Sequence, residues 1–185
     1  MNYYLGIDPG YKSGAFCLLS YDLKSVTFFD IENNLIEIAS FLKAYNEHVR
    51  IAFAMLERVH SSPRQGVASA FNFGRGYGWM EALLNCVNIP YEAVEPKKWM
   101  ANIPTEAKQE LLNDSMNQKE REKLRNRNKV NLKKNTFDFC KHIFPTAELV
   151  NFSKHSNRSD ALGIAYYCWA KYGEVSETIM ASGEN

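Results

Sequence analysis

The stretch LGIDPG (residues 5–10) ends an apolar run on a carboxylate, Asp8, and follows it at once with Pro9-Gly10. The run over residues 2–8 predicts a buried β-strand. A charge at the end of such a strand is costly unless something pairs with it. Asp8 therefore has two interpretations: it belongs to a turn, where aspartate is common, or it holds a cation.

Strand and turn signals continue outward from this segment. Strands are expected at 15–20 and 25–31, joined to the first strand in a hairpin meander. The almost wholly apolar run 51–59 has the composition of a buried parallel strand, and the right-handed crossover rule places it parallel to the first. This pattern predicts a mixed α/β domain. The other expected elements are helices ending near 48 and spanning 68–87, 128–143 and 159–172, the last stopped by Gly173, and a strand at 89–94.

Two further carboxylates are placed to join Asp8. Glu57 directly follows the apolar IAFAML, and Asp160 opens the expected last helix. If the first and fourth strands are neighbours, Asp8 and Glu57 leave the sheet at the same edge. Converging carboxylates repel one another unless cations lie among them, and hard oxygen ligands suit Mg²⁺ or Mn²⁺. Two such ions are the usual apparatus of in-line phosphodiester cleavage, although Asp160 alone also fits a helix N-terminus.

The composition is that of an ordinary globular protein. The 185 residues, 45% hydrophobic and 23% charged, fit one domain. No apolar run approaches the ~18 residues of a transmembrane helix, and the N-terminus lacks a signal-peptide pattern, so we expect a cytoplasmic protein with no membrane partner. The four cysteines form no CxxC pair and are expected to be reduced core thiols.

The net charge of +1 hides a basic segment. Residues 97–141 carry twelve Lys and Arg against six acids, a net charge of +6, and the rest of the chain carries −5. A basic segment on an acidic body suggests contact with a polyanion. The alternating signs over 119–123 favour a solvated helix face instead, when charge pattern alone is considered.

Four short motifs occur in order along the chain: GIDPG (6–10), LERVH (56–60), SAFNFGRGYG (69–78) and SDALGIA (159–165). Together they resemble the RuvC-type Holliday junction resolvases, and the phage-type members are most similar, given RQGVASAFNFGRGYG and PKKW. The resemblance covers about residues 2–172 and implies a ribonuclease H-like fold, with a five-stranded mixed sheet flanked by helices. It also implies a homodimer, metal-dependent nicking of two opposed strands at a four-way DNA junction, and the cytoplasm of a bacterial cell or phage-infected host as the location.

By position, the resemblance assigns Asp8, Glu57 and Asp160 as catalytic acids that hold two Mg²⁺ ions, which Mn²⁺ can replace. His60 lies where bacterial members place an aromatic side chain that wedges into the junction. Lys97 and Lys134 match lysines that face DNA phosphates in those members. The residues expected to contact DNA are His60, Arg64, Arg75, Lys97, Lys98 and Lys134.

The chain departs from the family pattern at the fourth metal ligand. Members usually carry Asp or His three or four residues before the last acid, where this chain has Asn157 and Ser156. Asn157 faces the site if the last helix begins early, and His155 is the alternative ligand. The departure leaves two hypotheses: an endonuclease on branched DNA, or a non-catalytic junction-binding protein with a degraded metal site. GIDPG also occurs in actin-like ATPase folds, but no second phosphate-binding hairpin is apparent.

The resemblance also divides the chain. Residues 1–173 are expected to form one nuclease domain with a basic insertion at about 101–127, and 174–185 a polar tail.

Gly74, Gly76 and Gly78 lie in the helix expected over 68–87, where each costs up to ~1 kcal/mol relative to alanine. Close approach of another backbone, protein or DNA, explains them. Part of this helix is expected to face its twin in the dimer, through residues among Phe71, Phe73, Trp79, Met80 and Leu83.

Overall fold

The computed structural model describes residues 2–10, 13–31, 35–60, 66–104, 113 and 115–181. The first seven elements lie within two residues of the bounds expected from the sequence. In chain order the elements are β1 (Tyr3–Asp8), β2 (Ala15–Ser20), β3 (Val26–Asp30), α1 (Leu35–His48), β4 (Ile51–Glu57), α2 (Val67–Cys86), β5 (Tyr91–Val94), α3 (Pro96–Met100), α4 (Gln118–Ile143) and α5 (Phe152–Ala181).

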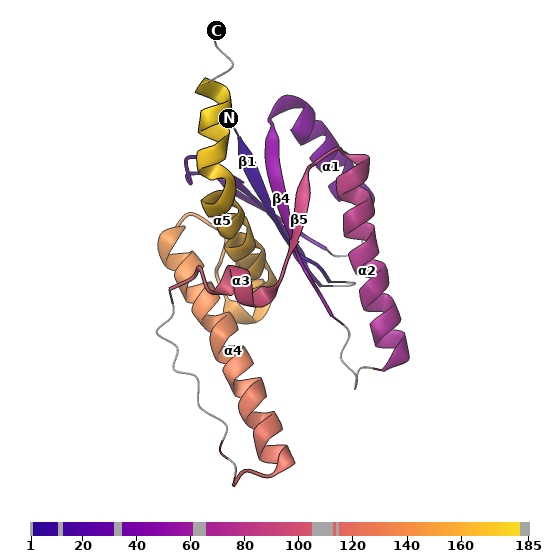
Figure 1. The fold of residues 1–185 in the computed structure, drawn as a ribbon, viewed down its shortest axis with the longest axis vertical. Helices are drawn as coiled ribbons and strands as arrows, with labels where there is room; N and C mark the ends of the chain where they lie inside the picture. The colour runs from indigo at the N-terminus through magenta and orange to yellow at the C-terminus, as the bar shows by residue number, and fades with distance from the viewer. Residues whose placement is uncertain are drawn as a thin grey trace.

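The five strands form one mixed sheet in the order β3-β2-β1-β4-β5. β1, β2 and β3 are antiparallel neighbours, which confirms the hairpin meander. β4 runs parallel to β1, and β5 parallel to β4, as the crossover rule predicts. Helices α1 and α2 pack on one face of the sheet, and α3, α4 and α5 cover the other (Figure 1).

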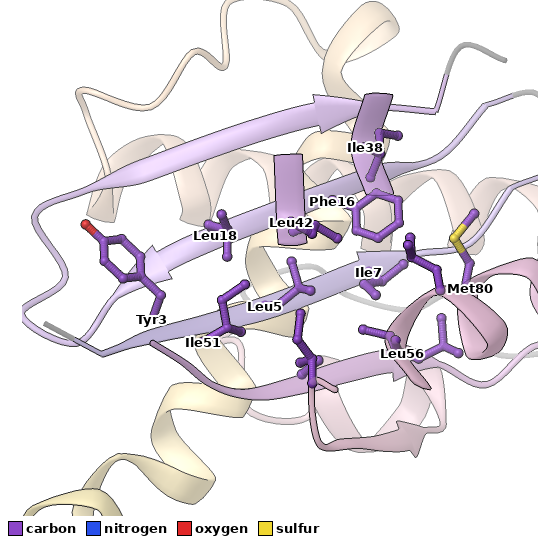
Figure 2. Close-up of a cluster of buried hydrophobic side chains, with 14 of the residues drawn as sticks. Tyr3, Leu5, Ile7, Phe16, Leu18, Ile38, Leu42, Ile51, Leu56 and Met80 are labelled. Atoms are coloured by element: carbon purple, nitrogen blue, oxygen red, sulfur yellow. The ribbon is translucent and has the colours of Figure 1, made fainter. Parts of the chain in front are cut away.

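Alternation along β1 divides its side chains between the two faces. Tyr3, Leu5 and Ile7 enter the core beneath α1 and α2 (Figure 2). Tyr4 packs in the core on the opposite face. Because successive strand residues alternate, Gly6 and Asp8 share that second face with Tyr4.

Gly6 is the point where β1 and α5 meet. A Cβ atom on Gly6 would lie 2.1 Å from the carbonyl oxygen of Ala161 and 2.3 Å from the backbone nitrogen of Ala165. Neither backbone atom can move without displacing the helix, so only glycine fits here. The contact fixes α5 against β1 and brings the residue before Ala161, Asp160, to the level of Asp8.

Helix α4 begins ten residues before the expected start at 128, so that prediction was wrong. A capping box explains the early start. Asn117 accepts a hydrogen bond from the backbone N–H of Glu120, and the Glu120 carboxylate accepts one from the backbone N–H of Asn117. The last ten residues of the expected insertion over 101–127, residues 118–127, therefore form the first part of a long helix.

Helix α5 also differs from the expected 159–172 at both ends. It begins at Phe152, where Asn151 accepts a hydrogen bond from the backbone N–H of Ser153. His155 has non-helical φ and ψ of −114° and 17°, which bends the helix near its start. Gly173 does not stop it: a single glycine costs about 1 kcal/mol, and the helix continues to Ala181.

Two expectations from composition are tested by the fold. Cys17, Cys140 and Cys168 are buried free thiols, as expected, but Cys86 is exposed at the end of α2. No helix in the described part of the chain is long and apolar enough to cross a membrane.

The sequence analysis expected another backbone to lie close to the glycines of α2. Cβ atoms on Gly74 and Gly78 would have no described atom within 4 Å, so no described part of this chain makes that close approach.

We predict that Gly6→Ala lowers the free energy of unfolding by about 3 kcal/mol, because the added methyl group overlaps two backbone atoms of α5. Gly173→Ala is the matched control. Its methyl group would lie in ordinary contact, 3.6–3.7 Å from Trp169 and Tyr21, in the helix α5, so it should raise the free energy of unfolding by up to about 1 kcal/mol. Urea titration measures both, and equal stability of Gly6→Ala and the wild type would contradict this packing.

Candidate functional site

Asp8 and Glu57 end neighbouring parallel strands. Ile7 pairs with Leu56 in the β1–β4 register, so the next residue of each strand lies at the same edge of the sheet. Met55 packs on the face of the sheet that α5 covers, and alternation places Glu57 on that face too. The structure thus brings the first two predicted acids together.

Asp160 approaches them from α5. It is almost fully buried, with 3% of its surface exposed. Its Oδ2 accepts a hydrogen bond from the Lys133 Nζ of α4 at 2.5 Å. Its other oxygen, Oδ1, is also buried and finds no hydrogen-bond donor among the described residues. Leaving a buried carboxylate oxygen without a hydrogen-bond donor costs free energy, so this oxygen is a candidate ligand for a cation.

The three carboxylates act on one another electrostatically. Burial raises the pKa of Asp8 well above its ordinary value, and the negative charges of Asp160 and Glu57 raise it further. Burial also raises the pKa of Glu57 and of Asp160, against the lowering effect of their hydrogen bonds. Gathering these acids therefore costs free energy unless positive charge joins them.

Lys133 supplies positive charge within the site. Burial alone would lower its pKa, but Asp160, Asp8 and Glu57 raise it by more, so the net shift is upward and the ammonium stays charged. The sequence analysis counted Lys133 only as part of the basic segment. Its spacing could have identified it as an inward-facing residue, because Lys133, Phe137 and Cys140 lie on one face of α4 and the last two are buried.

Trp99 holds Glu57 in place. Its indole Nε1–H donates a hydrogen bond to Glu57 Oε1 at 2.9 Å. The ring is fully buried on α3 and lies against Gly163 of α5, where a Cβ would come within 2.9 Å of it. The motif PKKW drew attention to this residue only as a resemblance; its bond to Glu57 depends on the docking of α3 beside β4.

An open pocket of about 620 Å³ lies in front of Asp8 and Glu57. Asn157 lines it, as expected if the last helix begins early. His155, the other suggested ligand, accepts hydrogen bonds at Nδ1 from the backbone N–H groups of Val150 and Asn151, 3.0 and 3.4 Å away. The lining residues are Asp8, Pro9, Gly10, Ser13, Glu57, Val59, Ala68, Ser69, Asn72, Phe73, Lys133 and Asn157.

The residues expected to contact DNA lie on several elements. His60 is exposed three residues beyond Glu57, and Lys97 and Lys98 are exposed on α3, next to Trp99. Arg75 of α2 lies over the Trp79 ring, 4.7 Å from its centroid. Lys134 is exposed on α4 and pairs with Asp138 at 2.7 Å. Arg64 lies outside the described residues.

The donor set fits a hard divalent cation, although it is not a ready-made cluster. Among the described residues, no three His, Cys, Asp or Glu side chains lie close enough together to bind a metal ion as they stand. Asp8, Glu57 and Asp160 nevertheless offer oxygen ligands, among them the Oδ1 of Asp160 that no described donor reaches, and Asn157 offers a carbonyl oxygen nearby. Of the residues expected to hold metal, Asp8, Glu57 and Asn157 line this pocket, and Asp160 lies behind it, paired with the pocket residue Lys133; His155 does not line it.

Solved structures with the same architecture include Thermus thermophilus RuvC. In complex with its Holliday junction substrate it matches with a TM-score of 0.58 and 15% identity, over 95% of this chain and 96% of that chain. The chain has a ribonuclease H-like fold. RuvC without a named substrate matches with a TM-score of 0.58 and 14% identity, over 94% and 96%.

Yeast mitochondrial Holliday junction resolvase Ydc2 also matches, with a TM-score of 0.47 and 14% identity, over 97% of this chain and 83% of that chain. No family model matches this chain, and no curated protein matches it. At 14–15% identity, the two RuvC structures establish the fold alone. The expected membership among phage-type resolvases stays a prediction.

We predict that Asp8→Asn stabilises the metal-free protein at pH 7 by about 1 kcal/mol, because it removes a charge that burial disfavours. An acid with a raised pKa in the folded state contributes stability at low pH, which is lost as its carboxyl ionises. The advantage of Asp8→Asn should therefore shrink as the pH falls towards about 3.9, the ordinary pKa of aspartate.

Thermal unfolding in EDTA across this pH range measures the difference. Asp138→Asn is the control, because Asp138 is an exposed carboxylate on α4 and its loss should change the stability by less than about 0.5 kcal/mol. A destabilised Asp8→Asn variant at pH 7, or a difference that does not vary with pH, would refute the electrostatic description of the site.

Proposed function

We propose that this protein is a divalent-metal-dependent endonuclease that resolves four-way DNA junctions by paired nicks, in DNA recombination, repair or phage DNA processing. The main support is the convergence of Asp8, Glu57 and Asp160 from three elements, beside an open pocket and with one carboxylate oxygen that no described donor reaches. The RuvC structure that shares this fold is a complex with a Holliday junction substrate, which supports a four-way junction as the substrate here.

Each acid has a distinct place in this proposal. Asp8, whose pKa is raised by the charges of both of the other acids, would contribute oxygen ligands to the cation site. Glu57 accepts a hydrogen bond from Trp99, and Asp160 lies on α5, which packs closely on β1 at Gly6. When bound, Mg²⁺ or Mn²⁺ supplies an activated water and stabilises the leaving oxygen. The protein's own part is to hold these oxygens still and to seat the phosphodiester in the pocket.

Basic and aromatic residues around the pocket would hold the DNA. Lys97 and Lys98 are exposed on α3, beside Trp99, and Lys134 is exposed on α4, beside Lys133; their charges can neutralise phosphates. The imidazole of His60 can stack on an unpaired base at the branch point, although more weakly than a larger aromatic ring. Arg64 and Arg75 complete the proposed DNA-contacting set.

A labelled four-way junction tests the proposed activity directly. The wild type should nick two opposed strands in Mg²⁺, with replication-fork and flap substrates run in parallel. Asp8→Asn should abolish nicking while binding the junction as tightly as the wild type or more tightly, because one negative charge near the phosphate is lost. Gel-shift titration in EDTA measures the binding.

Two results would contradict this proposal. Cleavage by Asp8→Asn within tenfold of the wild-type rate would remove Asp8 from the chemistry. A wild type that binds the junction but cuts none of the substrates, in Mg²⁺ or in Mn²⁺, would support a non-catalytic junction-binding protein instead.

Asn157, in the place of an acidic ligand, should lower the affinity of the proposed metal site for its cation. A neutral carbonyl oxygen binds a hard cation more weakly than a carboxylate does, so the enzyme should need millimolar Mg²⁺. Asn157→Asp should lower the Mg²⁺ concentration for half-maximal cleavage by about tenfold, and a metal titration of the cleavage rate measures it. If Asn157→Asp leaves the metal dependence unchanged and Asn157→Ala cleaves normally, Asn157 is not a ligand.

Paired nicks need two active sites related by a twofold axis, so we propose a homodimer through α2. Met80 and Leu83, named among the expected dimer contacts, are instead buried in the chain's own core. Val67 and Phe71 are exposed at 87% and 69%. With Gly74 and Gly78 they form one helical stripe at spacings of four, three and four residues, open enough for a second backbone.

Phe71→Ser should therefore weaken self-association at least tenfold, because it removes the largest exposed apolar side chain of this stripe. Ile36→Ser on α1, where Ile36 is 82% exposed, is the matched control and should leave the dimer intact. Light scattering over a concentration series measures both. A wild-type mass of 21.2 kDa for the free protein at micromolar concentration, together with one protein chain per junction in the DNA complex, would exclude the dimer.

A further inference from the structure

We propose that Lys133 is a built-in competitor of the divalent cation, holding Asp160 in the metal-free protein and leaving it when the cation binds. This inference rests on the proposed function, because it concerns the same carboxylates. It adds a role for a residue of α4 that neither the sequence motifs nor the proposed ligand set includes.

The geometry allows one cation at Asp160 Oδ2, and the ammonium of Lys133 is already there at 2.5 Å. A divalent ion binds a carboxylate oxygen at about 2.0–2.6 Å, so the two cations would repel strongly at such a distance. The neighbouring Oδ1 has no donor among the described residues and remains free to take the ion once the ammonium has moved.

The two partners differ in their freedom to move. Asp160 lies on α5, whose backbone packs closely against β1 at Gly6. Only 4% of the Asp160 side chain is exposed. The Lys133 side chain is 32% exposed and lines the open pocket of about 620 Å³. The lysine can therefore swing into the pocket, whereas the carboxylate cannot follow it.

The charges around Lys133 explain why it is needed without metal. Asp8 from β1, Glu57 from β4 and Asp160 from α5 all act on its ammonium, and Lys129 of the same helix adds positive charge nearby. Without Lys133, Asp160 would be a buried charge with no ion pair at Oδ2. Lys134, the next residue, pairs with Asp138 on the exposed side of α4 instead.

Competition fixes the sign of the effect on metal binding. The apparent affinity for the cation is reduced by the fraction of protein in which Lys133 occupies Asp160. Removing the ammonium removes the competitor and leaves one more net negative charge beside the ion, and both changes favour the cation. A lysine that merely shaped the site would give the opposite result, because its loss would disturb the ligands.

Calorimetric titration of Mn²⁺ into the DNA-free protein tests this proposal. Lys133→Met, which keeps a long unbranched side chain without its charge, should bind Mn²⁺ at least tenfold more tightly than the wild type. Its melting temperature in EDTA should be lower, and Mn²⁺ should raise it by more. Lys141→Met is the control: it removes an exposed positive charge two turns further along α4 and should leave the Mn²⁺ affinity within about threefold.

Lys133→Gln, which retains a donor for Asp160, replaces Lys133→Met if the latter does not fold. Equal or weaker Mn²⁺ binding by the folded Lys133 variant overturns the proposal. Asp8→Asn separates this failure from that of the proposed function: if it binds Mn²⁺ as tightly as the wild type, the carboxylates are not the metal site. Absence of Mn²⁺ binding by the wild type and the Lys133 variant alike overturns both.

Discussion

The site depends on the backbone contact between Gly6 and α5. A strand and a helix come this close only where the strand lacks a side chain, and Gly6 supplies that gap beneath Ala161 and Ala165. Asp8 is the next residue of β1 on the same face, and Asp160 immediately precedes Ala161. The packing that secures the sheet to its last helix therefore also brings together the half-buried Asp8 and the buried Asp160, whose negative charges repel one another.

The gathered acids require compensating groups from other parts of the fold. Helix α4 packs beside α5 through Phe137 and Cys140, and the same inward face delivers Lys133 to Asp160. Helix α3 brings the Trp99 indole to Glu57. Both contacts favour the charged form of a buried carboxylate, and both lie on helices that follow β5 in the chain. Clustered carboxylates whose pKa values are raised by burial are typical of functional sites.

Much of the fold is predictable because it depends on local patterns. The apolar runs that form β1 and β4, each ending on an acid, are enough to place Asp8 and Glu57 at one edge of the sheet. The start of α4 was missed because polar, alternating charges hid a capping box between Asn117 and Glu120. The continuation of α5 past Gly173 was missed because a glycine penalty of about 1 kcal/mol was given too much weight.

The residues that pair with the acids, Lys133 and Trp99, are harder to predict from the sequence. Helical spacing places Lys133 on the inward face of α4, but it does not say which residue lies opposite, because that depends on the docking of α4 against α5. The bond from Trp99 to Glu57 joins residues 42 positions apart and likewise depends on tertiary packing. Periodicity in a sequence assigns a side chain to a face, whereas partners across the core follow only from the assembled structure.

The central claim, that Asp8, Glu57 and Asp160 together hold the catalytic cation, is tested most directly by anomalous X-ray diffraction from crystals grown with Mn²⁺ and a four-way junction. The account predicts a manganese peak within about 2.5 Å of oxygens from these acids, with the Lys133 ammonium displaced from Asp160. A peak bound by other residues, or no peak and Lys133 still paired with Asp160, would contradict it.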